Sequence, residues 1–467
     1  MAIAIVVILL VVGSVIFHFA SPWWFTPIAS NWGMIDTTVD ITFWVTGVVF
    51  VLVNLFLAYC VIKFRHKAGQ KAHYEPENKK LETWLTVITA VGVAAMLAPG
   101  LVVWGQFVDV PDDAHEVEVV GQQWHWSFRY PGKDDEFGKV DPLLISVDNP
   151  FGMDPDDPTG QDDVLIAGSQ MHLPVDKPVK VLLRSKDVLH NYTVPQFRVK
   201  MDMVPGTISH LWLTPTSPGK YEIMCEELCG MAHHTMRGRV VVDTQEDFDA
   251  WLQQQPTYAD IAGAPSGDVE AGKVSFAACA ACHGQQAEGN LALNAPKLAG
   301  LDAWYLKRQL QNYKPGIRGS DPNDMLGAQM RGMAAALVDD AAINNVVAYI
   351  GSLPDSPSPQ TIDGDVSQGA QLFATCVNCH GKQGEGIWTM NAPRIAGMSD
   401  WYTARQLRDF RDGIRGGHPL DFYGRQMAQM SQMLDDEQEI NDVVAYLNTL
   451  GGVRVATTDT GAPGSHK

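Results

Sequence analysis

The segment MCEELCGMAHHTM, residues 224–236, gathers sulfur and imidazole side chains in a short run. Cys225 and Cys229 are followed by His233 and then by Met236. A Cys–Cys–His set can form a tetrahedral zinc site with a fourth ligand from elsewhere, and two thiols outside the cytoplasm can instead form a disulfide. A thioether is a soft ligand that suits copper better than zinc. The residue types therefore favour a copper site that transfers electrons, with zinc and a disulfide as the alternatives.

A second chemical motif occurs twice in the C-terminal half. CAACH begins at Cys279 and CVNCH begins at Cys376. C-x-x-C-H is the attachment signature of c-type haem, in which the thiols bond to the porphyrin and the adjacent histidine ligates the iron. Two copies make chance occurrence or a thiol redox motif the weaker explanation. The residues that carry this chemistry are Cys279, Cys282 and His283 in the first copy and Cys376, Cys379 and His380 in the second.

An iron held in this way needs a sixth ligand, and methionine is the usual partner of histidine in electron-transfer haems. Met330 and Met427 each follow their motif histidine by 47 residues. Met333 and Met430 are matched in the same way, and a lone methionine is more often a filler of an irregular core. Spacing alone therefore leaves both pairs open.

The elements that must position the haem motifs are themselves repeated. APKLAG at Ala295 recurs as APRIAG at Ala392, and the other matched segments share the same offset of 97 residues. A constant offset indicates duplication of one small domain. The apolar residues within 304–313 and 341–350 have helical spacing. We therefore expect two mainly α-helical domains, at residues 265–355 and 362–453.

The segment with the sulfur and imidazole ligands lies in a different kind of structure. Between residues 115 and 243, short runs rich in Val, Ile, Tyr and Trp alternate with Pro and Gly. Such runs predict an antiparallel β-sandwich or barrel. A short helix capped by Asp243 or Thr244 closes this domain, and residues 256–268 are typical of a linker. We assign the β domain to residues 111–255, with the ligand segment in a loop between late strands.

The N-terminal part predicts a membrane anchor. Three apolar runs contain no Lys, Arg, Asp or Glu: residues 2–20, 41–62 and 83–108. About 20 apolar residues suffice to cross a bilayer, so residues 31–110 predict a hairpin of two membrane helices. Residues 1–30 hold either a further transmembrane helix or a signal peptide, although a basic start and a clear cleavage site are lacking. Because the loop at residues 63–80 carries six Lys or Arg and two Glu, it is expected in the cytoplasm and the later domains outside.

The charge balance limits the partners of the external domains. The formal net charge is −19, and acidic runs such as residues 154–163 lie in the external part. A strongly acidic surface argues against nucleic acid as a partner. Any single acidic run is most simply a solvated surface, and the runs taken together also suit a basic protein partner.

Segments of the β region resemble cytochrome c oxidase subunit II. CEELCGMAHHTM matches the C-x-E-x-C-G-x-x-H-x-x-M pattern of that family's binuclear copper centre, CuA. GQQWHWSFRYPG and DVLHNYTVPQFRVKMDMVPG match two further segments, and the likeness spans residues 35–245. It implies a cupredoxin-like sandwich in which both cysteines bridge two coppers. The implied copper ligands are His190, Cys225, Glu227 through its carbonyl, Cys229, His233 and Met236.

The same resemblance implies roles for neighbouring residues. The side chain of Glu227 would bind a magnesium ion shared with the catalytic subunit. Trp124 matches the tryptophan that receives electrons, whereas Trp126 is expected in the core of the sandwich. Glu82, at the cytoplasmic start of a span, matches the carboxylate at the mouth of a proton channel, although a Glu there is often only a solvated residue near a helix N-terminus. His234 has no counterpart among the ligands.

The duplicated region resembles the di-haem cytochromes c, in APKLAGLDAWYLKRQLQNYKPGIRG and its copy as well as in the haem motifs. In that family the first methionine of the M-x-x-M pair ligates the iron. The resemblance therefore selects Met330 and Met427. Subunit II commonly ends soon after its β domain, and some members carry one fused haem domain, so a fused pair departs from the common pattern.

Together the resemblances imply a multi-domain membrane protein with N-terminal transmembrane α-helices, an all-β cupredoxin-like sandwich and two all-α cytochrome c domains. They imply an electron-transfer subunit of a respiratory oxidase in a bacterial inner membrane, with its copper and haem domains on the periplasmic side. Its partners would be catalytic subunit I, subunit III, and an external cytochrome c or quinol–cytochrome c reductase. No oxygen-reducing site is expected on this chain. The copper subunit of a nitric oxide reductase and a stand-alone membrane-anchored electron carrier are the alternatives.

Overall fold

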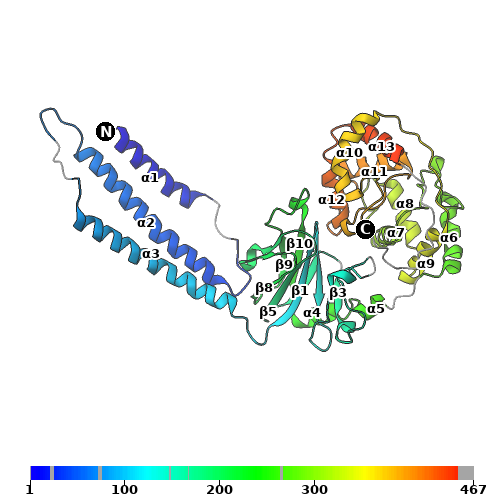
Figure 1. Cartoon of the computed structure of the whole chain (residues 1–467), viewed down its shortest axis with the longest axis horizontal. Helices are drawn as coiled ribbons and strands as arrows, with labels where there is room; N and C mark the ends of the chain where they lie inside the picture. The colour runs from blue at the N-terminus through cyan, green and yellow to red at the C-terminus, as the bar shows by residue number, and fades with distance from the viewer. Residues whose placement is uncertain are drawn as a thin grey trace.

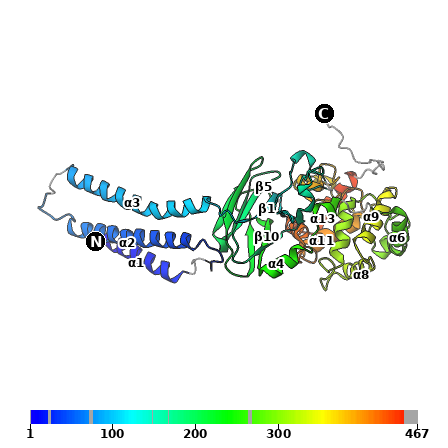
Figure 2. The same cartoon turned by 90° about the horizontal axis from the view of Figure 1, so that it is seen from below.

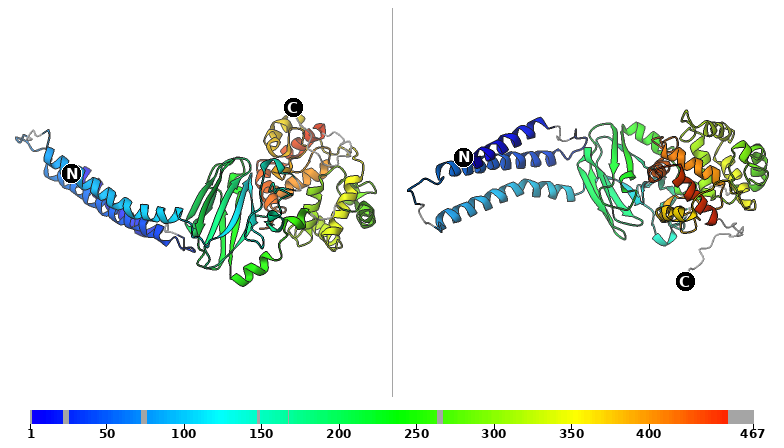
Figure 3. Two further views of the ribbon diagram at one scale, coloured as in Figure 1. Left: turned by 60° about the horizontal axis from the view of Figure 1, so that its bottom comes forward. Right: turned by 90° about the horizontal axis from the view of Figure 1, so that it is seen from above.

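The computed structural model describes residues 2–21, 26–71, 76–146, 149–166, 168–262 and 267–450. Three parts follow one another in space, from long helices through a β domain to a helical region (Figure 1). The same succession is seen from below in Figure 2 and from two further directions in Figure 3. This arrangement confirms the fold class expected from the sequence.

Within the described part of the chain, three helices are long and apolar enough to cross a membrane: α1 (Ala2–Ala20), α2 (Gly33–Lys63) and α3 (Lys79–Val108). Many of their large apolar side chains are exposed, as expected for helices of this length that face lipid. α1 lies beside α2, where the rings of Phe19 and Trp44 are 6.4 Å apart. Each apolar run expected to span the membrane is therefore part of a helix.

The membrane helices are fastened to the β domain by polar contacts. Arg198 donates to both carboxylate oxygens of Asp36, at 2.6 and 2.8 Å. The Trp32 indole donates to the Trp212 carbonyl at 2.9 Å, and the Trp212 indole donates to the Gln106 carbonyl at 3.1 Å. The first turns of α2 are polar, and their Asp36 pairs with Arg198 of the β domain. The charge-free run of α2 follows these turns.

The described strands of the β domain form two five-stranded sheets, ordered β3-β2-β1-β5-β8 and β4-β10-β9-β6-β7. The first sheet contains β1 (His115–Gln122), β2 (His125–Tyr130), β3 (Val164–Ile166), β5 (Val179–Ser185) and β8 (Ile208–Leu213). The second contains β4 (Gln170–Pro174), β6 (His190–Val194), β7 (Val199–Met203), β9 (Gly219–Met224) and β10 (Arg237–Asp243). One apolar core, which includes the fully buried Trp126 and Tyr192, draws on both sheets. The expected β-sandwich is confirmed.

Two strand pairs differ from the antiparallel expectation. β1 pairs with β5, and β10 pairs with β4, in parallel. Parallel neighbours need a long connection between them, and each of these pairs is separated by other elements along the chain. The mixed pairing thus follows from the chain's path between the sheets, which the local apolar pattern does not encode.

The β domain also extends further along the chain than expected. α4 (Gln245–Leu252) is capped by Thr244, which is one of the two expected caps. Beyond α4, the Leu165 amide donates to the Pro256 carbonyl at 3.2 Å. Tyr258, at the start of α5 (Tyr258–Ala262), is buried in a small core of this domain. Residues 256–262, expected as part of a linker, therefore pack on the β domain.

Two helical domains of the same design follow. The first, residues 267–355, contains α6 (Val269–His283), η5 (Leu291–Leu293), α7 (Ala303–Tyr313), α8 (Met325–Ala334) and α9 (Asp340–Ser352). The second, residues 362–450, contains α10 (Val366–His380), η6 (Trp388–Met390), α11 (Asp400–Arg411), α12 (Phe422–Ser431) and α13 (Glu437–Leu450). Asp268 caps α6 and Asp365 caps α10 at matching positions. Each helix that carries a haem motif therefore starts and ends at the same place in its repeat.

Each motif helix crosses the last helix of its domain at close range. A Cβ on Gly272 would lie 1.9 Å from the carbonyl oxygen of Asn345 on α9. A Cβ on Gly369 would lie 1.9 Å from that of Asp442 on α13. Only glycine permits this approach, which fixes the haem motif against the domain core.

The two helical domains exchange polar contacts reciprocally. Arg318 of the first domain donates to the Tyr402 hydroxyl at 2.7 Å and to Gln406 at 2.8 Å. Arg415 of the second domain, at the matching position, donates to the Tyr305 hydroxyl and to Gln309, both at 3.0 Å. The interface therefore has approximate two-fold symmetry.

A buried ion cluster closes the same interface. Lys297 and Arg394 occupy matching positions, and both pair with Asp355, at 2.6 and 2.8 Å. All three side chains are buried. The helical domains are therefore held as a pair by charge as well as by hydrogen bonds.

Candidate functional site

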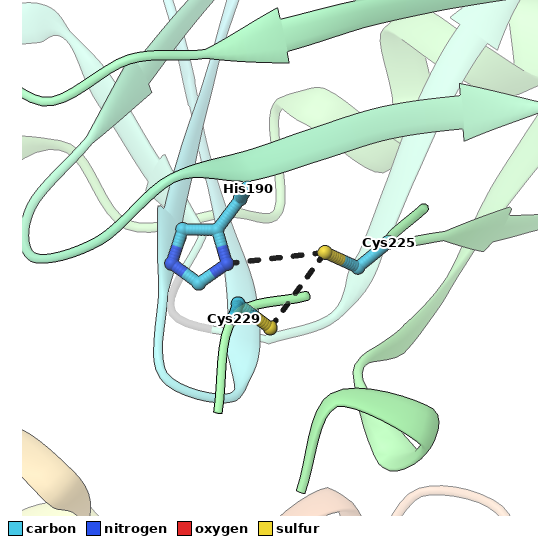
Figure 4. A group of neighbouring side chains, drawn as sticks. All are labelled: His190, Cys225 and Cys229. Atoms are coloured by element: carbon cyan, nitrogen blue, oxygen red, sulfur yellow. Dashed lines mark hydrogen bonds between the residues drawn. The ribbon is translucent and has the colours of Figure 1, made fainter. Parts of the chain in front are cut away.

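One cluster of potential metal ligands lies at the end of the β domain, where His190, Cys225 and Cys229 meet (Figure 4). Their ligand atoms lie within 4.8 Å of one another, and all three residues are buried. The two Sγ atoms are 3.7 Å apart. A disulfide requires about 2.05 Å, so the thiols are not bonded to each other. The structure therefore has no disulfide between Cys225 and Cys229.

Strand ends position this cluster. His190 is the first residue of β6, and its Nδ1 lies 3.9 Å from Cys225 Sγ. β9 ends at Met224, directly before Cys225. β10 begins at Arg237, directly after Met236. The loop between β9 and β10 is thus pinned at both ends by the sheet.

Three further donor atoms of this loop reach the thiols. The Glu227 carbonyl lies 3.2 Å from Cys225 Sγ. His233 Nδ1 lies 3.5 Å from Cys229 Sγ, and Met236 Sδ lies 3.8 Å from it. The six residues implied as copper ligands are therefore brought together. Their donor set of two thiols, two imidazoles, a thioether and a carbonyl suits a soft metal such as copper.

Asp187 orients one of the imidazoles. Its carboxylate accepts a hydrogen bond from His190 Nε2 at 2.8 Å, which leaves Nδ1 facing the thiols. Burial acts to lower the pKa of His190, but Asp187 and Cys225 outweigh it and raise that pKa. A carboxylate partner of this kind fixes the tautomer and orientation of a ligating histidine.

The two thiols are hydrogen-bonded to each other. This bond lowers the pKa of Cys225 and raises the pKa of Cys229, so Cys225 is the thiol that ionises first. The thiolate is the form that binds metal.

Trp124 lies against the ligand loop. Its indole Nε1 donates to the Cys229 carbonyl at 3.1 Å, and Gln123 Nε2 donates to the same oxygen at 2.7 Å. Trp126, two residues later, is fully buried in the sandwich core, as its expected packing role requires. Both tryptophans of the W-H-W run are therefore buried in the sandwich core, and Trp124 also contacts the ligand loop.

The haem motifs line a cavity that runs through both helical domains. Its lining includes His283 and Met330 from the first domain and His380 and Met427 from the second. Met333 also lines this cavity, whereas Met430 is not among the described residues that line it. In each domain, the motif histidine therefore shares a cavity with the methionine selected by the resemblance.

The motif histidines are held in one tautomer. His283 Nδ1 lies 2.7 Å from the Pro296 carbonyl, and His380 Nδ1 lies 2.8 Å from the Pro393 carbonyl. A carbonyl can only accept, so Nδ1 carries the proton and Nε2 keeps its lone pair. Burial lowers the pKa of both histidines, which keeps them neutral. The residues present therefore fit a haem held by neutral imidazole.

Glu82 and His234, which the sequence analysis also considered, lie away from the ligand cluster. Glu82 lies in the first turn of α3 and accepts a hydrogen bond from the Asn78 amide at 3.3 Å, while Asn78 caps the helix. His234 lies outside the ligand cluster, and its Nε2 is 3.4 Å from the amide oxygen of Gln429 on α12. Glu82 thus takes part in a helix cap, and His234 lies at a contact between domains.

Family models match the three extramembrane domains. Residues 115–244 match the model described as the periplasmic domain of cytochrome c oxidase subunit II. Residues 269–354 and 366–451 each match the model for cytochrome c. The matches coincide with the β domain and with the two helical domains.

Individual relatives agree with these matches. The chain is 60% identical to the alternative cytochrome c oxidase subunit 2 of Bradyrhizobium diazoefficiens over 263 residues. This match covers 56% of the chain and 95% of the relative. Among solved structures, it is similar to the periplasmic domain of subunit II of the cytochrome oxidase of Bradyrhizobium japonicum, at 26% identity and a TM-score of 0.22, over 31% of this chain and 95% of that one. It is also similar to cytochrome c4 from Pseudomonas stutzeri, at 31% identity and a TM-score of 0.32, over 39% and 97%.

The relative from Bradyrhizobium diazoefficiens is matched over nearly its whole length. The β domain is periplasmic and the N-terminal helices anchor it in the membrane. The chain transfers electrons within a cytochrome c oxidase complex, which displaces the alternatives of a nitric oxide reductase subunit and a stand-alone carrier. It belongs to the cytochrome c oxidase subunit II family, and it carries two cytochrome c domains fused behind its periplasmic domain.

Proposed function

We propose that the β domain holds the binuclear copper centre CuA and that each helical domain holds one covalently attached haem c. The observation that supports this most is the convergence of four further donor groups on two thiols 3.7 Å apart. The electrons come from an external cytochrome c or a quinol–cytochrome c reductase. They leave for catalytic subunit I of a haem-copper oxidase, which also contains subunit III.

In the copper site, the thiols of Cys225 and Cys229 would hold both metal ions. The imidazoles of His190 and His233, Met236 Sδ and the Glu227 carbonyl would be the other ligands. The bound pair supplies one-electron chemistry. The protein contributes a donor set whose members already lie within 3.9 Å of a thiol, so that a change of oxidation state needs little movement.

In the haem sites, the two thiols of each motif attach the porphyrin and the motif histidine binds the iron. Met330 in the first helical domain and Met427 in the second would supply the other protein ligand of each iron. Methionine in this position raises the reduction potential, which suits a carrier that must accept electrons from another cytochrome.

Further roles concern the assembled complex. The Glu227 side chain binds a magnesium ion shared with the catalytic subunit, Trp124 receives electrons for the copper site, and Glu82 stands at the mouth of a proton channel. We infer that α1 is a retained third span in the bacterial inner membrane, because its rings pack against α2.

Replacement of one bridging thiol tests the copper assignment. Cys229→Ser should abolish the near-infrared band and the multiline copper resonance of a mixed-valence pair, while both haem c spectra remain. Cys60→Ser, in α2, is the matched control, because Cys60 lies outside the described ligand cluster. Two coppers with unchanged spectra in Cys229→Ser would refute the assignment.

A further inference from the structure

Two arginines at matching positions of the repeat, Arg318 and Arg415, meet at the seam between the helical domains. They are only 7% and 8% exposed. The side-chain oxygen of Gln309 accepts from Arg318 Nη1 at 2.6 Å and from Arg415 Nη2 at 3.0 Å. The side-chain oxygen of Gln406 also accepts from both, at 2.8 and 2.6 Å. Because each amide oxygen joins both guanidinium groups, two buried positive charges are held next to each other.

The described hydrogen-bond partners of this arginine pair are side chains without a negative charge. Besides the two glutamines, Arg318 donates to the Tyr402 hydroxyl and Arg415 donates to the Tyr305 hydroxyl. Burial removes the water that would solvate a cation, so a buried cation ordinarily needs an anion beside it. The polypeptide has not placed one within hydrogen-bonding distance of either arginine in the part of the chain that the structure describes.

Three carboxylates lie in the same region, but each is used for another purpose. Asp324 and Asp421 line the cavity of the haem motifs, and each accepts from a backbone amide in the first turn of its helix, at 2.7 and 2.9 Å. Asp409 interacts electrostatically with both arginines, and its carboxylate accepts from the Gln406 amide at 2.6 Å. These aspartates therefore cap helices or orient a glutamine.

Each arginine also keeps one donor without an acceptor. The Nε atoms of Arg318 and Arg415 are both buried, and neither has a hydrogen-bond partner among the described residues. A buried donor without an acceptor is destabilising. The same unmet donor at two matching positions indicates an acceptor that comes from outside the polypeptide.

The Tyr305 hydroxyl reflects the excess of positive charge at the seam. Burial acts to raise the pKa of Tyr305, but Arg415, Arg318 and Arg308 outweigh burial and lower that pKa. Nearby cations favour the negatively charged form of a group. The seam therefore favours an anion.

The arginine pair can be reached from two spaces. Arg318 and Arg415 both line the cavity that contains the motif histidines. They also both line a second hollow of about 300 Å³, which lies between the loops at residues 317–322 and 413–419. An acceptor can therefore approach from the haem side or from solution.

We propose that Arg318 and Arg415 form a single oxyanion-binding site that is shared by the two helical domains. A planar guanidinium group matches the paired oxygens of a carboxylate or a phosphate. The porphyrin of haem c carries carboxylate side chains, which would approach the pair from the cavity, and inorganic phosphate would offer the same chemistry from the second hollow. The inference rests on the proposed haem c in each helical domain. Because each arginine is bonded to side chains of both domains, one site acts on both haems.

The test measures the midpoint potentials of both haems by spectroscopic redox titration of the full-length chain in its oxidase complex. In Arg318→Gln the bound anion loses part of its counter-charge, which favours the ferric state. At a fixed poise, the ratio of reduced to oxidised haem should fall about tenfold for both haems, which corresponds to about 59 mV for a one-electron couple. Arg415→Gln should have the same effect.

Two further variants separate this role from a merely structural one. Arg318→Lys keeps the charge but replaces the planar fork by a point charge, so it should lower both ratios by less than Arg318→Gln does. Lys273→Gln is the matched control, because Lys273 is an exposed cation on α6 and is not among the described residues that line the cavity. It should leave both potentials unchanged.

Titrations with and without inorganic phosphate, at equal ionic strength, identify the source of the anion. Potentials that do not respond to phosphate would support the haem carboxylates. Potentials that respond to phosphate in the wild type but not in Arg318→Gln would support an anion from solution.

Unchanged potentials in the glutamine and lysine variants, with both haems present, would overturn the site, and a shift confined to one haem would overturn its shared character. If the glutamine variants lose haem, Arg318→Lys decides by the same measurement. Haem analysis of the wild type keeps the two proposals apart. A helical domain without haem c would contradict the proposed function, whereas two haems with unmoved potentials would contradict the arginine site alone.

Discussion

At the scale of single residues, the sites depend on groups that hold their ligands in place. Asp187 fixes the tautomer of His190, and the carbonyls of Pro296 and Pro393 do the same for the motif histidines. A ligand held in this way does not have to reorient when metal binds. Hydrogen bonds from the polypeptide itself therefore orient the histidines in both kinds of site.

The axial methionines can be tested one by one. Met427→Ala should lower the midpoint potential of one haem, because a thioether ligand raises it, and should remove the absorption band typical of Met-ligated haem c. Met430→Ala is the matched control, three residues further along α12 and not among the described residues of the haem cavity. The assignment in the second domain would be reversed if Met430→Ala, and not Met427→Ala, caused these losses. Met330→Ala and Met333→Ala make the same comparison in the first domain.

The sequence indicates which donor residues cluster better than it indicates the residues that support them. Cysteine, histidine and methionine are uncommon, and their spacing in the copper loop is specific enough to identify a family. Asp187 and Gln123 lie in segments that resemble the family, but the resemblance implied no role for either residue, and aspartates are common in this acidic chain. Their roles depend on hydrogen bonds across strands, which the sequence does not reveal.

At the scale of elements, the interface between the helical domains depends on a shared carboxylate. Lys297 and Arg394 both pair with the buried Asp355. Asp355→Ala removes the charge that these two buried cations share, and breaking a buried ion pair in this way costs about 3–5 kcal/mol. We expect a lower melting temperature for the helical region, followed through the haem circular dichroism.

An exposed ion pair provides the control for that experiment. Glu437 pairs with Arg408 and Arg411, and its side chain is more than half exposed. Glu437→Ala should change stability by about 0–1 kcal/mol, since exposed pairs contribute little. Equal shifts of the melting temperature in the two variants would mean that the buried ion pairs of Asp355 stabilise the interface no more than an exposed pair does.

Element types were easier to predict than their pairing. The repeat offset and helical spacing predicted α7 and α9. The short runs rich in Val, Ile, Tyr and Trp predicted a β domain between residues 115 and 243. They are a weak guide to β6 and β7, because the segments HNYTV and VKMDM place polar residues among apolar ones. Parallel pairing of β1 with β5 depends on contacts between distant segments, so a local pattern cannot predict it.

At the scale of the whole molecule, the fused domains replace a diffusing donor by a tethered one. Tethering raises the effective concentration of the donor without any new contact. Removing both helical domains, in a chain that ends at Ala262 and so keeps α5 on the β domain, should leave copper binding and assembly intact. Turnover should then require added cytochrome c and fall steeply with ionic strength, because the acidic surface would steer the encounter.

Stopped-flow traces distinguish the two forms. In the full-length chain, copper reduction should follow haem reduction, whereas the shortened chain should show direct reduction of copper by added cytochrome. Copper reduced before either haem in the intact protein would contradict this order, as would a shortened chain that turns over equally fast without added cytochrome.

The chain leaves the β domain, builds the first helical domain at the far end, and returns to place its last domain over the Trp124 face. Translation proceeds from the N-terminus, so the copper loop is exported before the domain that covers it has been made. Until the last domain has folded, α12 does not lie against the loop that holds Cys225 and Cys229. We therefore expect these two thiols to be more accessible early in biosynthesis than in the finished protein.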